Sequence, residues 1–140
     1  MIKSNVDLAL CFDDILLVPQ RSSVPSRHIV NTSMIIGSGN RTITLDLPVI
    51  AAPMDTVCDI EMCIALANAG GLGILHRYMS YDEQVRKAKT LSDAEFGFGV
   101  AIASNNGFLD QAQRLYDAGV RLLLVDTANG HGKYAVDAVA

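Results

Sequence analysis

The chain has 140 residues, half of them hydrophobic, and a formal net charge of −4 at pH 7. This composition is typical of a globular chain that buries a core, and the lack of a basic excess argues against a nucleic-acid partner. No apolar run is long enough to span a membrane and the first ten residues lack the apolar centre of a secretory signal, so we expect a cytoplasmic protein with no membrane partner.

Residues 1–46 are predicted to form an N-terminal arm followed by a small β-hairpin. The arm contains the polar stretch QRSSVPSR (20–27). Two short apolar segments, 29–36 and 42–45, then flank the turn-forming residues GSGN (37–40), which is the pattern of a hairpin.

Residues 47–140 alternate between apolar strands and amphipathic helices. The predicted strands are 47–52, 72–76, 98–103 and 121–126, which start about 25 residues apart. The predicted helices are 59–71, 80–91, 105–119 and a fourth that begins near Gly132. Strands that are apolar throughout and alternate with amphipathic helices indicate a parallel sheet covered by helices.

Local signals support these helix boundaries. Ser80 and Glu83 have the spacing of a capping box, and glycines follow the first and third helices as C-cap signals. The residues expected on the buried face of the third helix are Phe108, Ala112, Leu115 and Tyr116.

Two architectures accommodate this alternation, a doubly wound sheet and a (β/α)8 barrel. A barrel takes about 250 residues, and here the fourth helix reaches Ala140 without a stop signal. We therefore predict an α/β chain that is the N-terminal half of a (β/α)8 TIM barrel. It would be a single partial domain over 1–140, with the arm and hairpin in 1–46 and the first four βα units, truncated, in 47–140.

Polar residues follow each predicted strand, at the rim where parallel α/β folds bind ligands. Asp55, Arg77 and Asp126 bring charge to this rim, and residues 104–106 bring a hydroxyl and two amides. Each charged residue has a second interpretation. Asp55 would cap the helix that begins near Asp59 or tie down its own loop, Arg77 would be a surface cation, and Asp126 would form an Asx-turn.

The remaining polar motifs are interpreted as structural. We expect His76 and His131 to be buried or solvated rather than catalytic. The glycines of AGGLGIL (69–75) precede a strand instead of following one, so they indicate a helix cap and turn rather than a dinucleotide site.

The three cysteines, Cys11, Cys58 and Cys63, have neither zinc-site nor CxxC spacing. They are predicted to be small buried thiols, and no metal site is predicted.

Nearly the whole chain resembles the IMP dehydrogenase / GMP reductase family. The motifs that carry the resemblance, in order and at compatible spacing, are CFDDILLVPQRSSV, LPVIAAPMDTV, MCIALANAGGLGILHRYMSYDEQ and LLLVDTANGHG. The resemblance implies a (β/α)8 barrel, a homotetramer and a purine nucleotide as substrate. In one branch GMP is reduced to IMP and ammonia with NADPH, and in the other IMP is oxidised to XMP with NAD.

Both branches use a cysteine on a later loop that bonds to the purine C2 carbon. That loop does not occur in these 140 residues, so no catalytic residue is assigned here. For the substrate nucleotide, the resemblance implies contacts from Ala52 and Met54. The residues that it implies for the cofactor are Ser26, Arg27, Arg77, Asp126, Thr127 and Ala128. An arginine suits a 2′-phosphate because its planar fork donates two hydrogen bonds.

We favour the reductase branch because the third predicted strand follows the second helix with no inserted module, and because RSSVPSR and DTANG are more similar to reductases. Pro53 argues the other way, since reductases more usually have Asn at that position. IMP dehydrogenase with NAD is therefore the alternative. Two further classes remain, a truncated nucleotide- or partner-binding module without catalysis, and a flavin-binding barrel of another family.

Overall fold

Residues 8–31 form a unit of their own, which contains two short 3₁₀ helices. The computed structural model describes residues 8–38 and 41–140, and these divide into one compact unit that ends at Asn31 and a second over Thr32–Ala140. The helices of the first unit are η1 (Phe12–Asp14) and η2 (Arg27–Ile29). Ser26 caps η2, because its hydroxyl accepts a hydrogen bond from the His28 amide at 3.3 Å.

The second unit begins with the predicted hairpin. Strands β1 (Met34–Ser38) and β2 (Arg41–Leu45) pair antiparallel in a register that runs from Met34 opposite Leu45 to Ser38 opposite Arg41. The hairpin prediction is confirmed, although residues 39 and 40 of the predicted turn lie outside the described residues.

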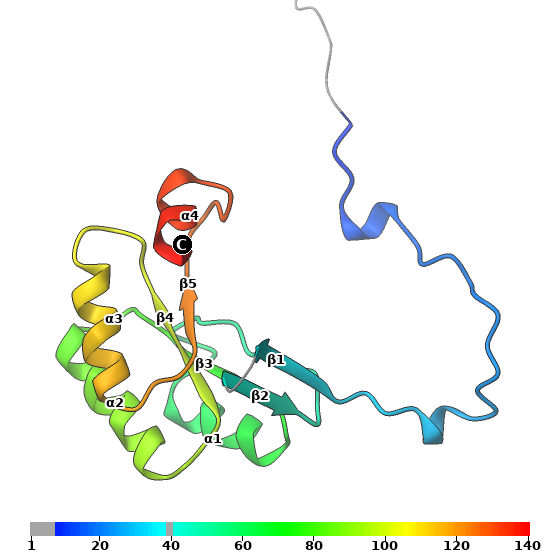
Figure 1. Ribbon diagram of the computed structural model, residues 1–140, viewed down its shortest axis with the longest axis horizontal. Coiled ribbons are helices and arrows are strands. Elements are labelled where there is room, and N and C mark those ends of the chain that lie inside the picture. Colours follow the sequence, from blue (N-terminus) through cyan, green and yellow to red (C-terminus); the bar gives the residue numbers. More distant parts are fainter. Residues whose placement is uncertain (1–7, 39–40) are drawn as a thin grey trace, which may run out of the picture. The chain divides into compact units, whose positions relative to one another are not determined.

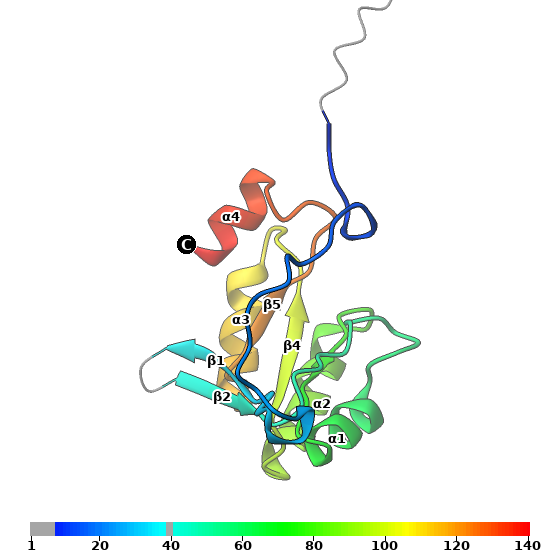
Figure 2. The ribbon, with the colours of Figure 1, turned by 90° about the vertical axis from the view of Figure 1, so that its right-hand side faces the viewer.

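Three parallel strands follow in the order β3 (Gly73–Leu75), β4 (Phe98–Ile102) and β5 (Leu123–Val125). Figure 1 labels all three strands, and Figure 2 shows β4 beside β5. The predicted strand at 47–52 is wrong as a full strand, since it contributes only an isolated parallel bridge between Ile50 and Leu72. Prolines at 48 and 53 bracket this segment and remove amide donors, which limits its ladder to a few bonds.

Four α-helices alternate with the strands as predicted. They are α1 (Ile60–Asn68), α2 (Tyr81–Asp93), α3 (Phe108–Asp117) and α4 (Lys133–Val139). Gly70 and Gly119 follow α1 and α3 with φ of 82° and 99°, the left-handed conformation that ends a helix cheaply only at glycine. Ser80 accepts a hydrogen bond from the Glu83 amide at 3.3 Å and so caps α2.

The strands are apolar on both faces because both are covered. Leu75, Val100 and Ile102 pack toward the helices, together with Leu91 and Leu115. The opposite face packs against the hairpin. The hairpin contributes Ile36, Ile43 and Leu45, and the parallel strands and their flanking residues contribute Leu72, Ile74, Ala101, Leu122 and Leu124. Within the described residues, β5 pairs with β4 alone. The chain is therefore a mixed α/β structure with a small parallel sheet and flanking helices.

One residue of the predicted helix face is placed wrongly. Tyr116 is 53% exposed, whereas Leu115 and the polar Gln111 are buried in α3. The tyrosine ring instead lies beneath the Arg121 guanidinium, whose carbon is 4.7 Å from the ring centroid. A cation over an aromatic face is favourable in water, so this contact holds the ring at the surface.

Candidate functional site

An open hollow lies at the carboxyl ends of β4 and β5. Figure 2 shows these strand ends near the segment that leads into α4. Its volume is about 500 Å³. The lining residues are Arg77, Ala103, Ser104, Asn105, Asn106, Asp126, Thr127, Ala128 and Tyr134. The hollow thus occupies the rim at which the sequence places polar groups, and where parallel α/β folds bind ligands.

An ion pair joins two strands across this rim. The Arg77 guanidinium donates from Nε to the Asp126 carboxylate at 2.8 Å, and the two side chains are 30% and 26% exposed. Arg77 also lies over the Tyr78 ring at 5.0 Å, and the Asp126 amide donates to the Ile102 carbonyl at 2.8 Å. Both partners are therefore held in place while keeping access to solvent. Arg77 is thus a partnered cation rather than an ordinary surface cation.

The eight sequence-predicted binding residues fall into three groups. Arg77 and the consecutive residues Asp126, Thr127 and Ala128 line the same hollow. Ala52 and Met54 lie in the loop after the Ile50 bridge and are not among its lining residues. Ser26 and Arg27 belong to the first unit, where they form the start of η2.

Sequence reasoning missed Tyr134, which contributes an aromatic ring to the hollow. Tyr134 is the second residue of α4 and is 75% exposed. The signal that was available is an aromatic residue in the first turn of a helix that follows the polar segment DTANGHG. An exposed ring at such a position offers a flat apolar face to a ligand.

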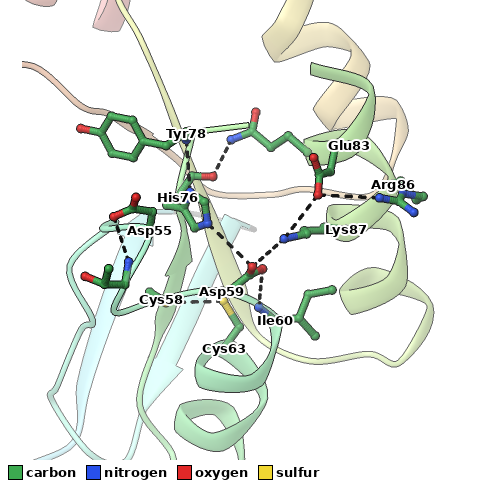
Figure 3. Close-up of polar contacts among 12 residues, drawn as sticks. Asp55, Cys58, Asp59, Ile60, Cys63, His76, Tyr78, Glu83, Arg86 and Lys87 are labelled. Carbon is green, nitrogen blue, oxygen red and sulfur yellow. Dashed lines mark hydrogen bonds and ion pairs between the residues drawn. The ribbon is translucent and has the colours of Figure 1, made fainter. Parts of the chain in front are cut away.

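Asp59, at the start of α1, has two hydrogen-bond donors and a histidine as polar neighbours (Figure 3). It is the N-cap residue and accepts from the Ile60 amide at 2.8 Å, and the Lys87 ammonium lies 2.5 Å from its other oxygen. His76 Nε2 lies 3.7 Å from the same oxygen. Burial acts to raise the pKa of Asp59, but the hydrogen bonds from Lys87 and Ile60 outweigh it and hold that pKa below its usual value.

His76 has a structural role, as the sequence interpretation expects. It is 5% exposed, and its Nδ1 accepts a hydrogen bond from the Tyr78 amide at 3.2 Å. A neutral imidazole that accepts at Nδ1 carries its proton on Nε2, which is the nitrogen that faces Asp59. The other rim histidine, His131, is exposed, and its backbone amide donates to the Asn129 side chain.

Asp55 does not cap α1, which corrects one of its two structural interpretations. The cap is Asp59, four residues further along the chain. The Asp55 carboxylate accepts from the Thr56 amide at 2.9 Å, so the interpretation that it ties down its own loop is confirmed. Asp55 lies five residues after the Ile50 bridge, at the start of the turn 55–57 that leads to α1.

Two buried glutamines, which the sequence analysis did not single out, fasten the carboxyl ends of β3 and β4. Gln84 donates from Nε2 to the carbonyls of His76 at 3.1 Å and Ala101 at 2.9 Å. Gln111 in turn donates to Gln84 Oε1 at 2.6 Å. The Gln84 amide thus makes three hydrogen bonds while the side chain is 1% exposed. The Gln84 side chain thus connects β3 to β4 where the pairing between their backbones stops, one residue before Arg77.

Two of the three cysteines are buried thiols, as predicted. Cys58 and Cys63 are 0% exposed, and their sulfurs lie 3.7 Å apart. The hydrogen bond between the two sulfurs lowers the pKa of Cys58, and the same bond together with burial raises the pKa of Cys63. The prediction is wrong for Cys11, which is exposed at the start of η1, where its amide and thiol both contact Asp14. That position precedes a single 3₁₀ turn, which contains no buried residue.

No group of three or more histidine, cysteine, aspartate or glutamate side chains in residues 8–38 and 41–140 has an arrangement that would hold a metal ion. None of the helices in this part of the chain combines the length and apolarity that crossing a bilayer requires.

Comparison with known proteins matches residues 9–140 to the family described as IMP dehydrogenase / GMP reductase domain. The chain is 49% identical over 83 residues to a GMP reductase of Leishmania donovani, which covers 57% of this chain and 16% of that protein. It is 39% identical over 110 residues to the inosine-5′-monophosphate dehydrogenase of Halalkalibacterium halodurans, covering 78% of this chain and 21% of the relative. The same enzyme of Nitrosopumilus maritimus is 35% identical over 123 residues, or 86% of this chain and 25% of the relative. The chain thus spans 16% to 25% of the length of these relatives.

Proposed function

The chain belongs to the IMP dehydrogenase / GMP reductase family, and from this premise we propose that it is part of a purine nucleotide oxidoreductase that uses a nicotinamide cofactor. The observation that carries the proposal is the hollow at the carboxyl ends of β4 and β5, with the Arg77–Asp126 pair at its edge. We propose that this hollow receives the cofactor.

The chemistry of the hollow fits a dinucleotide. Its lining offers a carboxylate, a guanidinium, three hydroxyls and two amides, and these groups match ribose hydroxyls, phosphates and a carboxamide. Ala128 leaves room for a flat ring, and Tyr134 offers an exposed aromatic face at the same wall. The nicotinamide, when bound, would exchange hydride at the purine carbon.

The chain's own residues would orient that cofactor. Asp126 has one carboxylate oxygen engaged by Arg77, which leaves the other able to accept from a ribose hydroxyl. The Arg77 fork donates to Asp126 from Nε, which leaves its terminal nitrogens available to an anionic group of the ligand. Since Gln84 fixes the carbonyl of the residue before Arg77, this donor would be positioned before the ligand arrives.

We favour reduction of GMP to IMP and ammonia with NADPH. Only residues 94–97 separate α2 from β4, so the described chain has no module inserted at that point. The identity to the Leishmania donovani GMP reductase, 49%, is higher than the 39% to the Halalkalibacterium halodurans dehydrogenase, over a shorter segment. Ser26 and Arg27 would contribute donors for the 2′-phosphate of NADPH. Oxidation of IMP to XMP with NAD is the second candidate, which Pro53 favours.

The substrate nucleotide would lie beside the loop that contains Ala52 and Met54. Met54 is 51% exposed, so its thioether presents an apolar face to a purine. None of the three cysteines is assigned as the nucleophile. Cys58 and Cys63 are buried against each other, and Cys11 lies in the first unit.

The remaining features of the proposal follow from family membership. We propose that the parallel strands belong to the first half of a (β/α)8 barrel, that the whole protein forms a homotetramer, and that it acts in the cytoplasm. The open edge of β5 within the described residues is consistent with a further strand at that position.

The decisive test is an assay of the intact protein with GMP and NADPH, and separately with IMP and NAD, which follows the absorbance of the reduced nicotinamide. Oxidation of NADPH with release of ammonia supports the reductase. Reduction of NAD with formation of XMP selects the dehydrogenase instead. Binding of nucleotide without turnover in either direction would support the non-catalytic alternative and overturn the proposal.

The role of the hollow is tested by Asp126→Asn, with Asp93→Asn as the matched control on the exposed end of α2. Loss of a hydrogen bond to a charged acceptor costs about 1.5–3 kcal/mol, so we expect the cofactor KM to rise at least about tenfold. The KM for the purine nucleotide should change much less. An equal rise in both constants would contradict the assignment of this hollow to the cofactor.

A further inference from the structure

Two thiols lie in contact at the start of α1, directly after the turn that contains Met54. Cys58 precedes the cap residue Asp59 and Cys63 is the fourth residue of the helix. These are the positions of a hydrophobic staple, in which a side chain before the cap packs against one in the first turn. Here both positions are cysteine, and the sulfurs are 3.7 Å apart in a site with no exposed surface (Figure 3).

The backbone around this pair is fixed on both sides. A Cβ at Gly73 of β3 would lie 2.5 Å from the Cys63 Cα, so α1 is packed against the strand as closely as a glycine allows. The Cys58 amide donates to the Met54 carbonyl at 2.9 Å, and its own carbonyl accepts from the His76 amide at 3.3 Å. The two sulfurs are therefore held at short range rather than meeting by chance.

We propose that Cys58 and Cys63 are an oxidation site that a hydroperoxide converts to a disulfide. In the first step the Cys58 thiolate attacks one oxygen of hydrogen peroxide, which gives a sulfenic acid and hydroxide. The hydroxide takes up the proton that Cys58 lost on ionisation and leaves as water. In the second step the Cys63 sulfur attacks the Cys58 sulfur, and its proton leaves with the displaced hydroxide as a second water. Two electrons pass from the thiol pair to the peroxide, and one S–S bond forms.

The environment assigns the two roles. Cys58 is the attacking sulfur because it directly follows the exposed turn 55–57, and because the hydrogen bond between the two sulfurs lowers its pKa. Cys63 is the resolving sulfur, since the same bond and its burial raise its own pKa. Bond formation requires the sulfurs to approach by about 1.6 Å, from 3.7 Å to the length of a disulfide.

Peroxide would reach Cys58 by local opening of the turn before it. Asp55, Thr56 and Val57 are exposed, so only this one turn has to move. Met54 accepts hydrogen bonds from both Val57 and Cys58, so a disulfide would tether the Met54 turn to α1. If the proposed function holds, oxidation then changes the KM for the purine nucleotide, and a thiol reductant restores it.

The chemical test uses the intact wild-type protein and needs no turnover. The reduced protein is treated with hydrogen peroxide, denatured, alkylated and digested with trypsin. Cys58 and Cys63 fall in one peptide between Arg41 and Arg77, while Cys11 falls in another. We expect the first peptide to lose two hydrogens and both alkylation sites. If both thiols stay alkylatable after Cys11 is oxidised, or form separate sulfinic acids, the proposal is wrong.

The variant Cys63→Ser separates the two steps. It should halt at the Cys58 sulfenic acid, which dimedone traps, whereas Cys58→Ser should give no trapped product in this peptide. Should either variant fail to fold, peptide mapping of the wild-type protein still decides the chemistry. The KM measurement on oxidised and reduced protein comes last, so failure of the nucleotide assay does not affect the conclusion on the disulfide.

Discussion

The buried glutamines of α2 and α3 and the polar side chains at the rim of the sheet differ in charge and exposure. Gln84 and Gln111 are neutral and 1% and 2% exposed, whereas the rim partners Arg77 and Asp126 are charged and 30% and 26% exposed. Neutral amides cost less to bury than ions, and every hydrogen bond that Gln84 makes is to a group that also needs a partner. The buried amides therefore set geometry, and the rim charges remain free to exchange solvent for a ligand.

The two groups are connected through one residue. Gln84 accepts from Gln111 and donates to the carbonyl of His76, and the next residue along the chain is Arg77. A substitution of a buried amide should therefore have its main effect on the free energy of unfolding and a smaller effect on the position of Arg77. A substitution at the rim should leave the free energy of unfolding nearly unchanged.

The largest expected effect is on stability, from Gln84→Leu. The substitution leaves the carbonyls of His76 and Ala101 without this donor and the Gln111 amide without its acceptor. Each buried group left unsatisfied costs about 1–3 kcal/mol, so we expect the free energy of unfolding, measured in urea, to fall by at least about 3 kcal/mol. The control is Gln113→Leu on the exposed side of α3, where the amide donates to the exposed Asp117 carboxylate, and this variant should change the free energy of unfolding little. Equal losses in the two variants would remove the distinction between buried and exposed amides.

A smaller, pH-dependent effect is expected at Asp59. Its pKa is below the usual value of 3.8 in the folded chain. A carboxyl with a lowered folded pKa stabilises the fold above its unfolded pKa, and this contribution is lost as the pH falls through the folded pKa. Asp59→Asn keeps a good cap but removes the charge that faces Lys87, so it should cost about 0.5–1 kcal/mol at pH 7 and nothing below the folded pKa.

Asp59→Ala removes the cap as well, and should cost about 1 kcal/mol more than Asp59→Asn at every pH. The measurement is the free energy of unfolding between pH 7 and the acid range, with Asp93→Asn as the exposed control. A pH-independent difference between wild type and Asp59→Asn would show that the Lys87 contact does not stabilise the fold.

The elements that the sequence predicts best are those that local signals determine. The alternation of strands and helices, the Ser80 cap, the glycine at 119 and the hairpin all follow from short-range patterns, and the structure confirms them. The strand at 47–52 is the main error in the fold. Its apolar composition is that of a buried strand, but a ladder also needs amide donors, and two prolines remove them.

The site was predictable only in part, for a similar reason. The ends of predicted strands identify Arg77 and Asp126, which the structure brings within hydrogen-bond distance. The Gln84–Gln111 contact was not predictable, because glutamine at a helical position is normally solvated and burial of both residues depends on how α2 and α3 pack. The Cys58–Cys63 contact was not predicted from the sequence, because the spacing of the two cysteines matches a hydrophobic staple rather than a redox motif.

The smallest expected effect on stability concerns the rim pair itself. A partly exposed ion pair contributes about 0–1 kcal/mol, so Arg77→Gln and Asp126→Asn should each lower the free energy of unfolding by less than about 1 kcal/mol. The double variant should show a coupling of similar size in a double-mutant cycle. Arg86→Gln, at a guanidinium 74% exposed on α2, is the control.

The same variants distinguish a structural pair from a binding pair. If Arg77 and Asp126 bind the ligand, each substitution should raise the free energy of cofactor binding by more than it lowers the free energy of unfolding. The reason is that a bound anion or ribose engages these side chains away from bulk solvent. A coupling in stability of more than about 2 kcal/mol, with cofactor binding unchanged, would make the pair part of the fold. In that case the Arg77–Asp126 pair would not recognise the ligand, and the next residues of the hollow to substitute would be Ser104, Asn105 and Tyr134.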